Sequence, residues 1–189
     1  MVRNCAVTII LGSPASGKTS LAAGLAEDAG VPCLCKDDIK ESLFEVLGTG
    51  EREWSRTLSG ASFAVLLRLA QTQITARTSC ILEGNWGPRH TAGLLALVAP
   101  GGVRCAQIRC RADPELIERR FRARQRHAGH LDAILAGELA AQAADPPPFL
   151  ELPGARWEYA SDDPAAFPEL LRQWTAWRRA AAPDDPPVT

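Results

Sequence analysis

An eight-residue stretch near the start of the chain, GSPASGKT at residues 12–19, constrains the fold more than any other feature. Gly12, four further residues, Gly17, Lys18 and Thr19 satisfy the pattern G-x-x-x-x-G-K-[ST] of a phosphate-binding loop, or P-loop. In such a loop the glycines let backbone N–H groups point inward around phosphate oxygens, and the following helix adds the positive end of its dipole. The residues expected to hold the phosphates are Gly12, Ser13, Ala15, Ser16, Gly17, Lys18, Thr19 and Ser20.

The segments on either side of this loop support the motif. The apolar run AVTIILG before it is typical of a buried strand, and an amphipathic stretch ending at Gly30 after it is typical of a helix. This is the strand–loop–helix order that the motif requires. Lys18 is expected to reach the β- and γ-phosphates, and the Thr19 hydroxyl to ligate Mg²⁺. The sequence therefore predicts a site for a nucleoside triphosphate, ATP with Mg²⁺.

Short apolar runs alternate with longer amphipathic stretches along the rest of the chain. This alternation predicts βαβ units and a parallel sheet covered by helices on both faces. Residues 126–148 fit it poorly, and we expect them to form a lid within one domain of residues 1–182. Residues 183–189 are expected to be a disordered tail. The strands are expected at residues 6–12, 31–36, 79–84, 103–110 and 155–161.

Composition narrows the classes of function. The formal net charge of the 189-residue chain is -1, whereas a sequence-independent nucleic-acid binder usually carries a basic excess. That class is disfavoured, although a local basic groove stays open. The apolar run at the start is too short to span a membrane, so we expect no membrane segment and a cytoplasmic protein. The six cysteines include no C-x-x-C pair, and we expect them to be reduced and partly buried.

The stretch KDDIKE, residues 36–41, places two adjacent carboxylates after the second expected strand. Asp38 and Glu41 have the spacing of an N-terminal capping box, in which side-chain oxygens accept the first free N–H groups of a helix. Asp37 is expected at the carboxyl end of a strand adjacent to the P-loop strand, which is where an open sheet forms its ligand crevice. From the residues alone, helix capping and chemistry both remain open for Asp37.

Two other classes of P-loop protein are disfavoured by missing features. A GTPase should carry an N-K-x-D guanine motif, which the sequence lacks. A AAA+ motor should have a strand that ends in paired acidic residues, together with a second helical domain. Here SCILEGNW ends its strand in one carboxylate, Glu83, and the chain is short. The remaining arrangement is that of a small kinase, with a P-loop, an acceptor site near the second strand and an arginine-bearing lid.

Four segments in order, GSPASGKT, KDDIKE, ILEGNW and RFRARQRHAGH, resemble P-loop kinases of the polynucleotide-kinase type. Chloramphenicol phosphotransferase and the zeta-toxin sugar-nucleotide kinases are relatives in the same broad group. The likeness covers roughly Thr8 to Ala160. It implies a three-layer α/β fold of the P-loop nucleoside-triphosphatase class, with a parallel five-stranded sheet in the order 2-3-1-4-5. It is specific for the fold and the phosphate chemistry, and unspecific for the acceptor.

The resemblance also implies roles for single residues. In polynucleotide kinases the segment that corresponds to KDDIKE supplies the catalytic base and a cation that grips the acceptor, which implies Asp37 and Lys40 here. Phosphoryl transfer to an alcohol does need a carboxylate that takes the hydroxyl proton. Glu83 is implied near the metal, together with Thr19. Trp86 either lines the acceptor pocket or packs in the core.

Arginines in the segment ERRFRARQRH carry the last part of the resemblance. Arg120 and Arg124 are one helical turn apart, and in the resembled kinases such arginines close over the triphosphate and stabilise the transition-state charge. Arg126 is a third candidate. His127 and His130 are expected to serve the lid or to contact the acceptor.

These inferences predict an enzyme that moves the γ-phosphate of ATP to a hydroxyl group of a small molecule. One alternative is a kinase for nucleic-acid 5′ ends, which would need a basic channel beside Asp37. A channel from Lys36, Lys40, Arg52 and Arg56 would be interrupted by interleaved glutamates. The other alternative is a regulatory nucleotide-binding module without turnover, although such a module has no need of a base. The sequence makes no prediction of the oligomeric state.

Overall fold

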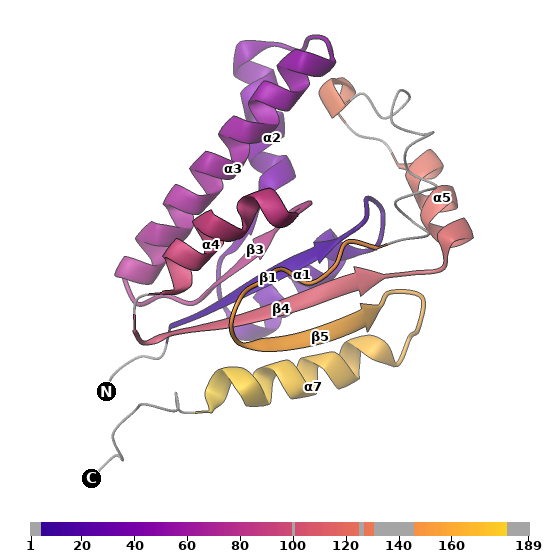
Figure 1. The fold of residues 1–189 in the computed structure, drawn as a ribbon. Coiled ribbons are helices and arrows are strands. Elements are labelled where there is room, and N and C mark those ends of the chain that lie inside the picture. Colours follow the sequence, from indigo (N-terminus) through magenta and orange to yellow (C-terminus); the bar gives the residue numbers. More distant parts are fainter. Residues whose placement is uncertain (1–4, 100, 125–126, 131–145, 181–189) are drawn as a thin grey trace.

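The computed structural model describes residues 5–99, 101–124, 127–130 and 146–180 (Figure 1). Five strands form one sheet in the order β2-β3-β1-β4-β5, and every neighbouring pair is parallel. This confirms the predicted order and the α/β class. The strands are β1 (Cys5–Gly12), β2 (Cys33–Cys35), β3 (Cys80–Glu83), β4 (Val103–Arg111) and β5 (Ala155–Ala160).

Helices cover both faces of this sheet (Figure 1). On one face the central strand β1 contributes Val7 and Ile9 to a core that includes Leu66 of a long helix. On the other face Ile10 packs with Leu25 and the C-terminal helix. Side chains of opposite orientation alternate along β1, and both sets are buried because both faces are covered. The helices are α1 (Lys18–Ala29), α2 (Lys36–Leu47), α3 (Arg52–Thr75), α4 (Thr91–Val98), α5 (Pro114–Ala123) and α7 (Ala166–Arg179), with 3₁₀ turns η1 (Pro88–His90) and η2 (Ala128–His130).

The six cysteines are free thiols, as predicted, and all but the half-buried Cys33 are buried. Burial raises the pKa of the Cys80, Cys105 and Cys110 thiols to about 12, so these side chains stay neutral and pack as small apolar groups. No helix in the part of the chain that the structure describes has the length and apolar character needed to cross a membrane.

The junction between β2 and α2 differs from the prediction in two ways. The strand ends at Cys35 and the helix begins at once at Lys36, with Cys35 as its N-cap residue and no side-chain cap hydrogen bond. The predicted capping box of Asp38 and Glu41 is therefore wrong, because Asp38 already lies inside the first helical turn. The carboxylates of Asp37 and Asp38 still favour this end of the helix, where the dipole is positive.

The position of β2 also corrects the expectation that it neighbours the P-loop strand. Strand β3 lies between β1 and β2, and pairs with both. Asp37 therefore faces the P-loop across the carboxyl end of β3, a gap one strand wide. A gap of this kind leaves room for a ligand between the two segments.

The predicted lid and tail lie largely outside the described residues. Within 126–148 the structure describes residues 127–130 and 146–148, and all of 183–189 is outside. The segment that begins at residue 146 and leads into β5 is fixed to the sheet by the buried Gln107 of β4. Its amide nitrogen donates to the Leu150 carbonyl oxygen at 3.1 Å, and its amide oxygen accepts the Leu150 N–H at 2.8 Å. These two bonds set the path of the chain into β5.

Candidate active site

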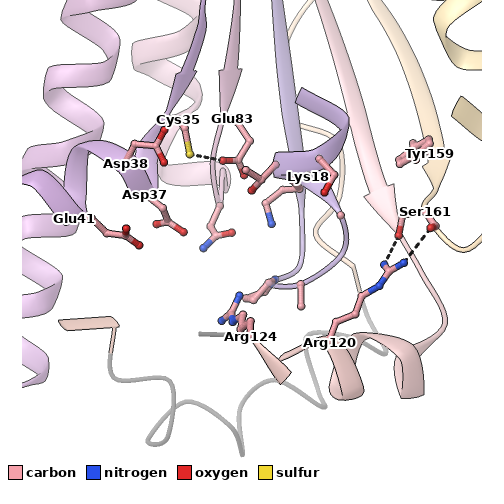
Figure 2. Close-up of a pocket in the computed structure, with 16 residues that line it drawn as sticks. Lys18, Cys35, Asp37, Asp38, Glu41, Glu83, Arg120, Arg124, Tyr159 and Ser161 are labelled. Carbon is pink, nitrogen blue, oxygen red and sulfur yellow. Dashed lines mark hydrogen bonds between the residues drawn. The ribbon is translucent and has the colours of Figure 1, made fainter. Parts of the chain in front are cut away.

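A pocket of about 540 Å³ lies at the carboxyl ends of the strands. Figure 2 shows its opposing walls, with Lys18 in the P-loop wall and Asp37 in the α2 wall. The carboxyl end of β3 supplies its floor, and α5 and the exit of β5 supply the remaining side. This is the crevice in which open α/β sheets bind their ligands.

The P-loop wall has the backbone shape that an anion-binding loop needs. Gly12 has φ +151°, and a side chain there would place its Cβ 2.5 Å from the Cys110 carbonyl oxygen, so only glycine fits. Gly17 has φ +91° and is the N-cap of α1, while Ala15 adopts φ +61°, an uncommon conformation for a residue with a side chain. No side chain caps α1 within the described residues. The first N–H groups of this helix therefore remain available for a phosphate.

Lys18 is buried in this wall, and its ammonium donates to the Ser13 carbonyl oxygen at 2.8 Å. Burial lowers its pKa, while the nearby Glu83 carboxylate acts in the opposite direction. The hydroxyl oxygen of Ser16 is fully buried and has no hydrogen-bond partner among the described residues. A buried polar group of this kind is costly unless a ligand or water satisfies it. The loop thus fits the triphosphate that its sequence predicts.

On the opposite wall, Asp37 projects from the first turn of α2 and is held by its neighbour. The Lys36 ammonium lies 2.9 Å from Asp37 Oδ1, and the Lys36 side chain is only 5% exposed. The ammonium also lies 5.8 Å from the centre of the Phe63 ring. A nearly buried cation in this position fixes the orientation of the carboxylate, a role that the sequence pattern does not reveal.

Glu83 ends β3 on the floor of the pocket, and the Cys35 thiol donates to its Oε2 atom at 2.8 Å (Figure 2). Burial raises the pKa of Glu83, and the Lys18 ammonium partly counteracts this effect. Thr19 lines the same pocket. No cluster of three or more histidine, cysteine or acidic residues that could hold a metal is found in the described part of the chain. Thr19 and Glu83 suit Mg²⁺, which keeps several waters and binds through few protein ligands together with phosphates.

Arg120 and Arg124 both line the pocket, as the resemblance implied. Arg120 lies in α5 and donates through Nη1 to the Ser161 hydroxyl at 2.7 Å and through Nη2 to the Ser161 carbonyl oxygen at 3.2 Å. Arg124 lies at the C-terminal cap of α5, with its guanidinium 4.1 Å from the centre of the Phe121 ring. Arg126 is outside the described residues.

Two residues expected to contact the acceptor are not brought to the pocket. The Lys40 ammonium donates to the Ser55 hydroxyl at 2.8 Å and lies 5.0 Å from the centre of the Phe44 ring. Trp86 is 2% exposed, packs against Phe63, and donates from Nε1 to the Leu82 carbonyl oxygen at 3.3 Å. For Trp86 the structure favours the packing alternative. Of the P-loop residues, Gly12, Ser13 and Ser16 lie behind the lining formed by their neighbours.

The pocket is also lined by residues that the sequence analysis did not assign to the site. Asp38 and Glu41 join Asp37 on the α2 wall, and Tyr159 and Ser161 lie at the exit of β5 (Figure 2). The positions of Asp38, Tyr159 and Ser161 near strand ends could have indicated them, because the carboxyl ends of parallel strands share one edge. Glu41 lies further into α2.

The two lid histidines hold the turn η2 against α2. The His127 ring stacks on Phe44 at 5.2 Å between ring centres, and His130 packs edge-on against the same ring at 5.7 Å. His130 Nε2 lies 2.7 Å from Glu41 Oε1. The Ser55 hydroxyl donates to the Gly129 carbonyl oxygen at 3.0 Å. These contacts fit the first of the two roles expected for the histidines, service in the lid, rather than contact with the acceptor.

Comparison with known proteins places this site in a family. The profile of the AAA_33 family, described as an AAA domain, matches residues 7–146. The chain belongs to the AAA_33 family. Although the family carries the AAA name, β3 of this member ends in the single carboxylate Glu83 rather than in an acidic pair.

Curated relatives of this AAA_33 chain are longer proteins. An uncharacterized protein of Mycobacterium tuberculosis H37Rv, Rv2004c, is 31% identical over 147 residues. A protein of Mycobacterium bovis, Mb2027c, shows the same identity over the same length. The match covers 74% of this chain but only 30% of each relative.

Solved structures identify the fold as that of P-loop kinases. A protein from Chloroflexus aurantiacus J-10-fl, described as a candidate kinase, is 28% identical, with a TM-score of 0.81 and coverage of 94% of this chain and 100% of that one. An APS kinase of Mycobacterium tuberculosis in complex with AMPPNP and APS has a TM-score of 0.58 at 18% identity, covering 94% and 99% of the two chains. A sugar kinase from Janibacter sp. HTCC2649 has a TM-score of 0.57 at 17% identity, covering 92% and 93%.

Proposed function

We propose that the protein is an ATP- and Mg²⁺-dependent kinase that transfers the γ-phosphate of ATP to a hydroxyl group of a small molecule. The observation that carries the proposal is the presence of a complete P-loop and the Asp37 carboxylate on opposite walls of one pocket. Support comes from the kinase fold and from the similarity to the Chloroflexus protein over its full length. The narrower likeness to polynucleotide kinases, chloramphenicol phosphotransferase and zeta toxins is part of this proposal.

In the proposed reaction, Lys18 and the loop N–H groups bind and orient the phosphates. Asp37 accepts the proton of the acceptor hydroxyl while that oxygen forms a bond to the γ-phosphorus and the bond to the β-phosphate oxygen breaks, which leaves ADP. Thr19 and Glu83 would hold Mg²⁺ directly or through water, and the ion would neutralise charge on the phosphates. Arg120 and Arg124 stabilise charge on the transferring group from the α5 side of the pocket.

Arg120→Ala is expected to lower kcat/KM for ATP by about 100-fold, because the guanidinium both lines the pocket and fixes Ser161. Arg120→Lys should rescue little of this loss, since an ammonium cannot make the two-pronged contact. Steady-state kinetics with ATP as the varied substrate measure the effect. Arg119→Ala is the matched control, because Arg119 is exposed and its ion pair with Glu115 is long, at 3.9 Å. Equal activity of the Arg120 and Arg119 variants would remove Arg120 from the proposed machinery.

The function is tested by measuring ADP production from ATP and Mg²⁺ in the presence of nucleosides, sugars, antibiotics and oligonucleotides with free 5′ ends. Acceptor-dependent ADP, with a phosphorylated product detected by mass spectrometry, is the expected result for a small molecule. Activity with oligonucleotides alone would establish the nucleic-acid kinase instead. If no acceptor raises ADP production above the background, the protein is a nucleotide-binding module without turnover.

A further inference from the structure

A thiol and a carboxylate meet on the floor of the pocket. Cys35 ends β2 and Glu83 ends β3, and the two residues are paired in the register of these neighbouring strands. Residues paired in this way place their side chains on the same face of a sheet. Both side chains line the pocket, and the Cys35 Sγ atom lies 2.8 Å from Glu83 Oε2 (Figure 2). The sheet itself therefore fixes this contact.

The thiol is the donor of this hydrogen bond. Burial and the neighbouring Glu83 carboxylate raise the pKa of the Cys35 thiol well above its usual range, so the sulfur keeps its proton. An ionised carboxylate offers only acceptors, whereas a thiol has one proton to donate. The bond therefore runs from Cys35 to one oxygen of Glu83, and it does not occupy the other oxygen, Oε1.

Lys18 is the second group that favours the charged form of Glu83. Burial raises the pKa of Glu83, and the Lys18 ammonium and the thiol hydrogen bond both lower it. The ammonium also donates to the Ser13 carbonyl oxygen, and in the proposed complex it contacts the β- and γ-phosphates. The phosphates then compete with Glu83 for this cation. The thiol hydrogen bond involves no phosphate, so it can orient the carboxylate both before and after the nucleotide binds.

We propose, on the basis of the kinase function and the Mg²⁺ site proposed above, that Cys35 is a positioning residue for Glu83. Its thiol holds Oε2, so that the carboxylate keeps one orientation and offers its other oxygen to the ion or to a water bound to the ion. A hydrogen bond to a ligating carboxylate affects metal affinity although the donor does not touch the metal. A thiol suits this buried position because it packs as a small apolar group and still supplies one donor.

The proposal is tested through the effect of Mg²⁺ on nucleotide binding. The affinity of the protein for a non-hydrolysable ATP analogue is measured by calorimetry, once with Mg²⁺ and once with EDTA, and the ratio of the two affinities is the metal enhancement. We expect Cys35→Ala to lower this enhancement by about tenfold or more, the usual effect of removing a hydrogen bond to a metal ligand. The affinity in EDTA should stay unchanged, because the phosphate contacts of Lys18 and the loop N–H groups do not involve the thiol.

Two further variants separate the hydrogen bond from packing. Cys35→Ser keeps a donor for the carboxylate, and it should retain most of the metal enhancement. Cys33→Ala is the matched control, since it removes the other thiol of β2, which is absent from the described lining of the pocket. Thermal unfolding establishes that the variants are folded. An enhancement lowered equally by Cys35→Ser and Cys35→Ala, or lowered as far by Cys33→Ala, would assign the effect to packing and overturn the proposal.

A double-mutant cycle links the effect of Cys35 to Glu83. Glu83→Gln alone should lower the metal enhancement at least as much as Cys35→Ala, because it removes the charge that the thiol is proposed to orient. Adding Cys35→Ala to Glu83→Gln should then lower the enhancement no further, since residues that act through one contact are not additive. Additive losses in the double variant, or a wild-type enhancement in Cys35→Ala, would overturn the proposal.

The outcomes separate this inference from the proposed function. Phosphate transfer to a small molecule, together with a wild-type enhancement in Cys35→Ala, overturns the inference and leaves the kinase function intact. The expected pattern of enhancements without transfer to any acceptor supports the role of Cys35 and contradicts the kinase function. If the wild-type protein binds the analogue equally well in Mg²⁺ and in EDTA, the assignment of Glu83 to the metal and the role of Cys35 are both overturned.

Discussion

Lys18→Ala is expected to lower kcat/KM for ATP by about 100- to 1000-fold, the usual effect of removing one preorganised donor from a charge-stabilising site. The ammonium is buried within the P-loop wall and lies in the pocket across from Asp37, so no water can replace its charge on the β- and γ-phosphates. The rate of ADP production and the equilibrium affinity for ATP, measured separately, should both be reduced.

The substitution also removes a buried side chain, so a second variant keeps the test interpretable. Lys18→Met retains most of the volume and deletes only the charge, and it should lose activity to the same extent. Circular dichroism and thermal unfolding establish that both variants are folded. A folded Lys18→Met protein with the wild-type kcat/KM would contradict the P-loop assignment.

Asp37→Asn is expected to lower the rate of phosphate transfer to the acceptor by about 100- to 10,000-fold, the usual contribution of a positioned general base. Asparagine keeps the shape of the side chain but cannot take up the hydroxyl proton. ATP binding should be unchanged, because the phosphates are held by the opposite wall. The measurement pairs single-turnover transfer with equilibrium binding of ATP, so that a loss in kcat is distinguished from a loss in affinity.

A control for this substitution lies on the first helix. Asp28 is exposed near the end of α1, roughly 15 Å from the P-loop at the usual rise per residue, and Asp28→Asn should leave both measurements unchanged. Transfer by Asp37→Asn at the wild-type rate would show that another group takes the proton. Lys36 holds one oxygen of Asp37, so substitution of Lys36 would then leave the transfer rate unchanged as well.

Much of the site was predictable because its signals are local. The P-loop is defined by the spacing of two glycines, a lysine and a threonine between a strand and a helix, and the structure places these residues as expected. Asp37 and Glu83 line the pocket because the first follows β2 and the second ends β3. Arg120 and Arg124 line it from the last turn and the C-cap of α5, a helix whose start the sequence marks with Asp113 and Pro114. The sheet order came from the resemblance and is confirmed.

The acceptor side was less predictable, and α2 shows why. The spacing of Asp38 and Glu41 matches a capping box, but the helix begins earlier, at Lys36, because the chain turns into it directly from β2. A pattern of alternating charges does not say which face of such a helix will be buried. Lys40 was expected to meet the acceptor, and instead it contacts Ser55 and the ring of Phe44.

The sequence by itself determined the nucleotide half of this protein, because a P-loop is made by consecutive residues and needs only its own strand and helix. The tertiary structure decided the acceptor half. Packing against Phe63 and Ser55 of α3 buries Lys36 and Lys40 of α2 and leaves its carboxylates lining the pocket. Strand β3 separates the two walls. For Asp37 the sequence and the tertiary structure gave the same position, at the pocket. That position depends both on the end of β2 and on the helix that follows it.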